Sequence, residues 1–393
     1  MESKISPHLS PTGAGRVFVL CFEDAEAGEA RIAGAAAAAH AAAQAGQAGA
    51  REILVATGDG APLSAQAWND IHRAAPNARP WIANGVAPHL SISGRVLVRA
   101  AALRRFADGD AAALRWRDET IATNPDGQGV VQAGDAEAVD AAAADASRWV
   151  LRGTAKPGDG LVSRLLNRPV SQAVSRVLLR IPGVRPWHMT VVTAAIGLIM
   201  LLALLWGGYA GLVAGGLLFH FASVVDGVDG EIARATYRSS ARGATLDTMV
   251  DMATNLSFYV GFTSAVTRLY GPKQALIGGM SLVLALFGLG MMIWLARRIG
   301  EPGSFDFIKR YYRMKCPTGL PRLIINTFIT LMSRDTFAFV WAFFILFHAP
   351  LLITYGLAFF ATLWVVLILI AAPPLLREGL IRPVGSLVLE QSR

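Results

Sequence analysis

The chain has 393 residues, 53% of them hydrophobic, and a mean hydropathy of +0.44. This composition excludes an ordinary soluble enzyme and is typical of a protein that combines a soluble part with membrane helices. The formal net charge of +8 is unevenly divided: residues 1–155 hold 14 Lys and Arg against 17 Asp and Glu, whereas residues 156–393 hold 22 against 11. Because the basic residues flank apolar spans, we expect them to face the cytoplasm and anionic lipid headgroups rather than nucleic acid.

The first part of the chain predicts a small cytoplasmic α/β domain. Residues 1–15 are polar and are expected to be disordered, and no charged-then-apolar secretory signal begins the chain. Strand-like segments at 16–22 and 52–57 flank an Ala-rich helix near 31–49, and residues 95–105 resemble a strand leading into a helix. This alternation predicts an α/β domain with a parallel sheet over residues 16–155. The two cysteines, Cys21 and Cys316, are too few and too distant for a disulfide framework or a zinc site.

Residues 156–186 form a second, different segment. Apolar residues recur there at helical spacing, with arginines between them. This pattern predicts a basic amphipathic helix that lies on the membrane surface, with a second helical piece starting near Pro169.

The remaining sequence predicts a bundle of six membrane helices in a domain of residues 187–375, followed by a cytoplasmic tail over 376–393. The fifth span is short for a bilayer crossing and can begin earlier, within 323–335. The links between spans one and two and between five and six carry no Lys or Arg, whereas the 2–3 and 4–5 links are rich in arginine. The positive-inside rule therefore places both termini on the cytoplasmic side of the inner membrane. The expected spans are 188–206, 209–226, 246–268, 274–296, 336–349 and 351–373.

Four carboxylates stand at the facing ends of spans two and three. Asp226 and Asp229 are three residues apart, and Asp247 and Asp251 are four apart, so each pair lies on one helix face. Two antiparallel helices can bring the pairs together into an all-oxygen site that suits Mg²⁺ or Mn²⁺, with room for two ions. Carboxylates are costly at a membrane boundary, and a bound cation offsets that cost.

The residues around these carboxylates suit a phosphate-bearing ligand. Small residues at 230, 233 and 243 let a ligand approach the backbone, and Arg234 and Arg238 supply charge for a diphosphate. One alternative is an acidic loop that its arginines neutralise without metal. Another is an ion or proton pathway, although a pathway would require acidic residues deeper in the spans and on more helices.

The pattern Asp-x2-Asp-Gly-x2-Ala-Arg-x8-Gly-x3-Asp-x3-Asp, complete from Asp226 to Asp251, resembles the signature of the CDP-alcohol phosphotransferases. The resemblance covers roughly residues 156–375. It implies that an acceptor hydroxyl attacks the β-phosphorus of a CDP-alcohol, that the alcohol phosphate is transferred, and that CMP leaves. It also implies a homodimer. One position departs from the pattern, because Trp187 stands where many members have Asn.

The resemblance assigns a role to each residue of the pattern. It implies that Asp251 is the general base and also touches metal. The other implied metal ligands are Asp226, Asp229 and Asp247, and the implied donor-binding residues are Gly230, Ala233, Arg234 and Gly243.

The soluble head resembles the cytidylyltransferase half of fused inositol-phosphate cytidylyltransferase and di-inositol-phosphate-phosphate synthases. Active heads of that type carry a Gly-rich basic loop after the first strand, but residues 23–31 here are acidic. We therefore interpret residues 16–155 as a degenerate nucleotidyltransferase-like domain that serves folding, partner docking or regulation. Asp59 is interpreted as a turn residue rather than a remnant ligand.

The predicted function is metal-dependent transfer of a phospho-alcohol from a CDP-alcohol in phospholipid or polar-lipid synthesis. Its partners are the donor, a lipid or polyol-phosphate acceptor and membrane lipids. Residues 309–315, with Arg334 and Asp335, could hold a phosphorylated polyol or contact anionic lipid. One alternative is a di-inositol-phosphate-phosphate type synthase with soluble substrates. The alternative from another class is a cation-binding transporter or a catalytically silent scaffold.

Overall fold

The computed structural model describes residues 16–81, 90–109, 111–139, 143–156, 159–300, 306–316, 318–331 and 333–378. The tail predicted over residues 1–15 and most of the tail predicted over 376–393 lie outside this part. The chain divides into two units. The first comprises residues 1–155, 172–186 and 230–239, and the second comprises residues 156–171, 187–229 and 240–393.

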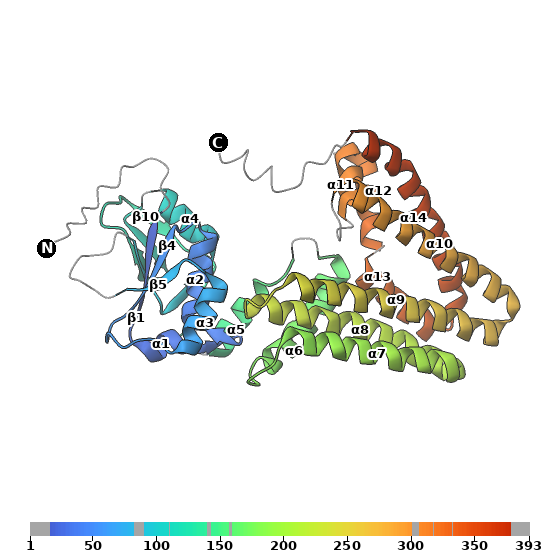
Figure 1. The fold of residues 1–393 in the computed structure, drawn as a ribbon, viewed down its shortest axis with the longest axis horizontal. Coiled ribbons are helices and arrows are strands. Elements are labelled where there is room, and N and C mark those ends of the chain that lie inside the picture. Colours follow the sequence, from blue (N-terminus) through green and yellow to red (C-terminus); the bar gives the residue numbers. More distant parts are fainter. Residues whose placement is uncertain are drawn as a thin grey trace. The chain divides into compact units, whose positions relative to one another are not determined.

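The first unit is built on a seven-stranded sheet in the order β10-β8-β9-β6-β1-β4-β5 (Figure 1). Neighbouring strands from β6 to β5 are parallel, whereas β9 pairs antiparallel with both β6 and β8. The expected α/β domain is confirmed, but its sheet is mixed, since short connections at β8–β9 permit antiparallel pairing. The strands are β1 (Val17–Phe22), β4 (Glu52–Thr57), β5 (Ala78–Pro80), β6 (Ser91–Ser93), β8 (Ala113–Trp116), β9 (Glu119–Thr123) and β10 (Val130–Gln132).

Helix α2 (Ala37–Gln47) explains the Ala-rich sequence near the start of the chain. Ala37, Ala38 and Ala39 are fully buried, so their small side chains let the helix pack closely on its neighbours. The expected helix over 31–49 begins late because a hairpin precedes it. Gly34 adopts a left-handed φ of 81° in the turn of that hairpin. The hairpin strands are β2 (Arg31–Ile32) and β3 (Ala35–Ala36).

Four further helices and a small antiparallel sheet complete the head. The expected strand and helix over 95–105 are confirmed as β7 and α4. These elements are α1 (Ala25–Glu29), α3 (Ala65–Ala74), α4 (Ala100–Asp108), α5 (Ala143–Arg152), β7 (Val96–Val98) and β11 (Ala136–Ala138).

The segment predicted to be an amphipathic surface helix, with a second helical piece starting near Pro169, does contain two helical pieces. A π-helical turn, η1 (Ser163–Asn167), is followed by α6 (Arg168–Leu178). Pro169 is the second residue of α6 and directly follows the junction with the π-helical turn. Ser175 of α6 is buried and donates a 2.6 Å hydrogen bond to Glu231. The location of this segment on a membrane surface stays a prediction.

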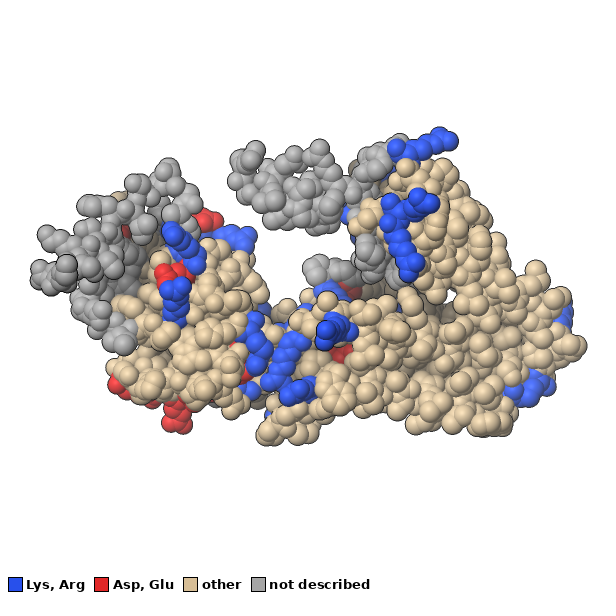
Figure 2. Space-filling view, viewed as in Figure 1, with Lys and Arg blue, Asp and Glu red and all other residues tan. Residues whose placement is uncertain are grey.

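The second unit consists of long helices. In Figure 1, α7, α8 and α9 run side by side, and α10 packs along α14. Much of its visible surface is uncharged, with Lys and Arg mainly towards its margins (Figure 2). The helices are α7 (Pro186–Trp206), α8 (Gly208–Ala235), α9 (Ala241–Tyr270), α10 (Pro272–Arg298), α11 (Asp306–Lys315), α12 (Gly319–Leu331), α13 (Arg334–Leu346) and α14 (Pro350–Glu378).

Four of these helices are long and apolar enough to cross a membrane: α7, α8, α10 and α14. Helices α12 and α13 meet the same requirement only as a pair, and they are bent by 68° at their junction. Helix α9 has 30 residues but is more polar, with acidic, Thr, Asn and Ser side chains along it. The described residues therefore contain four or five candidate spans, and the expected count of six is not confirmed.

Aromatic and small residues fix the helix packing near the acidic residues. Phe219 of α8 stacks on Phe258 of α9 with ring centroids 4.1 Å apart, and Trp341 of α13 stacks on Phe258 at 5.4 Å. A Cβ at Gly261 of α9 would lie 2.9 Å from Leu204 of α7, so only glycine permits this approach without a shift. These contacts hold α7, α8, α9 and α13 together.

Candidate active site

The four predicted metal ligands come from two consecutive helices. Asp226 and Asp229 lie towards the end of α8, and Asp247 and Asp251 lie in the second and third turns of α9. Ser240 caps α9 by accepting a hydrogen bond from the Gly243 backbone N–H. Because only five residues separate the two helices, their acidic ends stay close in space.

The structure brings three of the carboxylates into a group of the size that one metal ion requires. One carboxylate oxygen from each of Asp226, Asp247 and Asp251 lies within 4.8 Å of the others. Asp229 adjoins the group through its contact with Asp247. It is only 7% exposed and accepts a 2.9 Å hydrogen bond from Thr190 of α7. Clustered carboxylate oxygens are the donor set that Mg²⁺ and Mn²⁺ prefer, so the four residues fit such an ion.

Arg334, the first residue of α13, supplies positive charge to this cluster. Its guanidinium lies 3.3 Å from Asp226 and also forms a hydrogen-bonded ion pair with Asp251. Its Nε and Nη2 atoms are buried and have no hydrogen-bond partner among the described residues. Arg334 therefore joins the two helices of the acidic motif to a third and keeps donors for another anion.

The residue after Arg334 is anchored separately. Asp335 accepts hydrogen bonds from Ser223 of α8 at 2.7 Å and from Asn167 of η1 at 3.2 Å. The sequence left open whether Arg334 and Asp335 hold a phosphorylated acceptor or contact anionic lipid, and it did not indicate that Arg334 pairs with the signature. An isolated Ser-Arg-Asp at the start of an apolar helix was the available signal.

The predicted donor-binding residues lie on the same two helices as the acids. A Cβ added at Gly230 would lie 2.9 Å from the guanidinium of Arg234, so a side chain there would displace that group. Arg234 donates a 2.8 Å hydrogen bond to the Thr154 carbonyl oxygen. Ala233 shares α8, and Gly243 lies in the first turn of α9. Their contact with a nucleotide stays a prediction.

An Asp–Arg pair precedes the helical bundle. Arg168 donates two hydrogen bonds to Asp159, at 2.8 and 3.0 Å, and both side chains are 10% exposed. Burial acts to raise the pKa of Asp159, but the hydrogen bonds and charge of Arg168 outweigh it and hold the pKa below its ordinary value. Asp159 therefore stays ionised and fixes the start of the helical segment.

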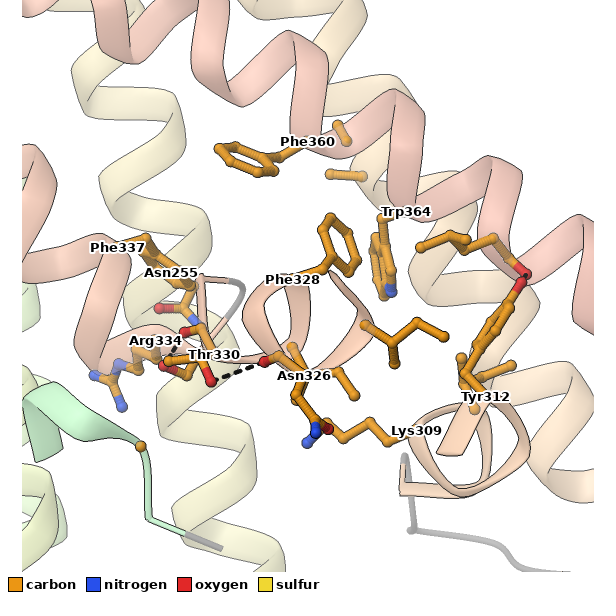
Figure 3. Close-up of a pocket in the computed structure, with 18 of the residues that line it drawn as sticks. Asn255, Lys309, Tyr312, Asn326, Phe328, Thr330, Arg334, Phe337, Phe360 and Trp364 are labelled. Carbon is orange, nitrogen blue, oxygen red and sulfur yellow. Dashed lines mark hydrogen bonds between the residues drawn. The ribbon is translucent and has the colours of Figure 1, made fainter. Parts of the chain in front are cut away.

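A cavity of about 1450 Å³ reaches Arg334 and continues among α9, α10, α11, α12 and α14. Figure 3 shows Phe328, Phe360 and Trp364 around its interior, with Arg334 and Asn255 on one side and Lys309 at its edge. The walls are mainly apolar, and the polar and basic side chains occur at its margins. The cavity thus suits a ligand with an apolar part and a charged part.

These features define a helical membrane protein with a carboxylate cluster fit for a divalent cation beside a large cavity. Residues 184–368 match the family model for CDP-alcohol phosphatidyltransferase. The resemblance found in the signature is therefore confirmed for residues 184–368, which match the model of this family.

Three curated relatives each bear the name "Bifunctional IPC transferase and DIPP synthase". The protein of Thermococcus kodakarensis is 37% identical over 36% of this chain and 31% of its own length. The protein of Archaeoglobus fulgidus is 31% identical over 36% of this chain and 26% of its own length. The protein of Aquifex aeolicus is 38% identical over 26% of this chain and 22% of its own length. The chain thus matches about a third or less of each relative's length.

Proposed function

We propose that the chain transfers a phospho-alcohol group from a CDP-alcohol to a hydroxyl in a metal-dependent reaction that releases CMP. The observation that carries this proposal is the convergence of Asp226, Asp247 and Asp251 within 4.8 Å, inside a segment that matches the family. The neutralised acidic loop is the competing interpretation. Arg334 supplies one positive charge to two carboxylates, so negative charge remains in the cluster that a further cation can neutralise.

In this proposal the four aspartates divide between binding and proton transfer. Asp226, Asp229 and Asp247 would hold one or two Mg²⁺ or Mn²⁺ ions, and Asp251 would touch the metal as well. Bound there, such an ion would neutralise charge on the diphosphate and on the leaving CMP. Asp251 takes the proton of the acceptor hydroxyl while the oxygen of that hydroxyl forms a bond to the β-phosphorus. The bond from that phosphorus to the bridging oxygen then breaks, and CMP departs.

Arg334 completes the phosphate-binding groups. Its Nε and Nη2 donors are buried and have no partner among the described residues, so they can bind non-bridging phosphate oxygens. Gly230, Ala233, Arg234 and Gly243 serve the nucleotide. The ion pair with Asp251 restrains the base before substrate binds.

The cavity favours a lipid among the substrates, in phospholipid or polar-lipid synthesis. Its apolar walls would shelter acyl chains while Arg334 and Lys309 meet charged groups. The names of the curated relatives favour a second candidate, a di-inositol-phosphate-phosphate type synthase with soluble substrates. For that reaction the cavity would have to accept polar ligands.

We further propose an inner-membrane protein with cytoplasmic termini and active site, on the charge distribution of its links. It works as a homodimer. Residues 16–155 form a degenerate nucleotidyltransferase-like domain, residues 156–186 a juxtamembrane segment, and residues 187–375 the transferase domain.

The test is CMP release by the detergent-solubilised full chain with Mg²⁺ or Mn²⁺. Donors would be CDP-diacylglycerol, CDP-inositol and CDP-glycerol, each offered with lipid and with soluble polyol-phosphate acceptors. Release that requires metal and a lipid substrate supports the first candidate. Release from soluble pairs alone supports the second. Absence of both CMP release and donor binding by calorimetry would contradict the proposal and favour a transporter or silent scaffold.

A further inference from the structure

A second cavity, of about 640 Å³, lies within the first unit and is here named the basic pocket. Its walls come from the β2–β3 hairpin, α3, α5, the end of α6 with the following turn, and residues 236 and 238. This volume is within the range of small-molecule sites. The pocket is unrelated to the signature cluster, because none of the four signature aspartates lines it.

Four arginines line the basic pocket, and no acidic residue does so among its described lining residues. Arg31 is paired with Asp70, and Arg238 donates a 3.4 Å hydrogen bond to the Val184 carbonyl oxygen. Arg176 lies in the last turn of α6, Arg180 lies in the turn that follows this helix, and both line the pocket. The pocket therefore concentrates positive charge on several separate chain segments.

The positive charges affect one another. Burial lowers the pKa of Arg238 from its usual value, and the nearby guanidinium groups of Arg73, Arg185 and Arg31 lower it further, while Asp70 opposes them. Crowding of like charges costs free energy, and an anion bound among them would remove that cost.

The walls of the basic pocket are held in place before any ligand arrives. A Cβ at Gly34 would lie 2.7 Å from Leu179 and 3.0 Å from Thr236, so three of the lining segments are in close contact. Ala33 donates its backbone N–H to Ser147 at 3.1 Å, which ties the hairpin to α5. A site with fixed walls loses little conformational entropy on binding.

We propose that the basic pocket binds a phosphate group, carried either by a soluble phosphate ester or by a lipid headgroup. Guanidinium groups bind phosphate through paired N–H donors, which suits four arginines arranged around one cavity. Arg238 belongs to the short connection between α8 and α9, the two helices that carry the signature aspartates. A phosphate bound in the basic pocket would therefore contact the segment between α8 and α9, which joins the two halves of the acidic motif. The proposal stands independently of the transfer reaction.

The experiment is calorimetric titration of the detergent-solubilised full chain in EDTA, so that no metal bridges the probe to the aspartates. The probes are glycerol 3-phosphate, dihexanoyl phosphatidic acid and, as a phosphate diester with a choline cation, dihexanoyl phosphatidylcholine. We expect saturable binding of one or both phosphate monoesters, weakened by salt. Binding of both indicates a phosphate ester as the ligand, and binding of phosphatidic acid alone indicates a headgroup.

The variant Arg176→Gln with Arg180→Gln should weaken binding about tenfold or more, because it removes two charged hydrogen-bond donors. Arg105→Gln, an exposed position on α4 outside the pocket, is the matched control and should bind as the parent does. An unchanged thermal unfolding midpoint shows that the double variant is folded. A second double variant, Arg176→Lys with Arg180→Lys, keeps the positive charge and should bind with intermediate affinity. The proposal is overturned if no phosphate monoester binds saturably, if phosphatidylcholine binds equally well, or if the folded double variant binds like the parent.

Discussion

The two units of the molecule differ in how their buried or partly buried carboxylates are neutralised. In the head, Asp70 is 2% exposed and is paired with two arginines, Arg31 and Arg73. In the helical unit, Asp226 and Asp251 share a single guanidinium, that of Arg334. A carboxylate that has two guanidinium partners is fully compensated and stabilises the fold, whereas two carboxylates that share one partner can still accept a cation.

The local structure shows the same difference. The Asp70 side chain also accepts a hydrogen bond from the Ala36 backbone N–H, so it closes the hairpin on α3. The carboxylates of the helical unit instead contact one another. This contrast separates a structural acid from a group of acids that suits ligand binding.

The largest expected effect is that of Asp251→Asn. If Asp251 takes the acceptor proton, this change should lower kcat by a factor on the order of 10² to 10⁴, because a positioned carboxylate contributes that much to proton transfer. CMP release at saturating donor and metal measures it. Asp108→Asn, an exposed position on α4, is the control and should keep full activity. Activity within a few-fold of the parent in Asp251→Asn would exclude Asp251 as the base.

Arg334→Ala tests the shared guanidinium. Removing it leaves Asp226 and Asp251 close together without their cation, which should lower the free energy of unfolding in EDTA by on the order of 3 kcal/mol. Thermal unfolding would measure this, and added Mn²⁺ should recover more stability in the variant than in the parent because the ion replaces the lost charge. Equal Mn²⁺ effects on both proteins would show that Arg334 and the metal do not share these carboxylates.

His40 makes the head sensitive to acid. Its Nε2–H donates to the Ile32 carbonyl oxygen at 2.7 Å, and its Nδ1 accepts from the Tyr237 hydroxyl at 2.9 Å. Burial lowers the pKa of His40 to about 4. Between pH 4 and about 6.5 the unfolded chain thus binds the proton that the folded chain excludes, so stability is kept above pH 6.5 and falls as pH drops towards 4.

The decrease in the free energy of unfolding that is due to His40 should reach about 3 kcal/mol at pH 4. His40→Gln should remove this part of the acid dependence, as measured by unfolding of the two proteins across that pH range. Parallel pH profiles for the parent and the variant would contradict the assignment.

The smallest effect is expected for Asp70→Asn. Its arginine partners are 33% and 46% exposed, so solvent screens part of the loss, and the free energy of unfolding should fall by only about 1–2 kcal/mol. Activity per folded molecule should stay within about twofold. A collapse of activity at full folding would show that the contrast between the two units is wrong.

Much of this arrangement could be predicted from sequence because its signals are local. The spacing of Asp226, Asp229, Asp247 and Asp251 predicted two carboxylate pairs on helix faces, and the structure brings three of the four into one group. Strand β1 and strand β4 followed from short apolar runs.

What the sequence did not predict depends on contacts between distant segments. Arg334 lies 83 residues from Asp251, and no local pattern links the two. The hairpin before α2 was missed because alanines favour helix, while the turn depends on the left-handed Gly34. The bend between α12 and α13 likewise left the fifth span undefined.

The most direct test of the carboxylate cluster is the effect of Mn²⁺ on the ³¹P NMR signals of a CDP-alcohol bound to the full chain. A paramagnetic ion held by Asp226, Asp229 and Asp247 against the diphosphate should broaden both phosphorus signals strongly. The broadening should be lost in Asp247→Asn although the donor still binds. Bound donor whose phosphorus signals stay sharp with Mn²⁺ in the parent protein would contradict the account.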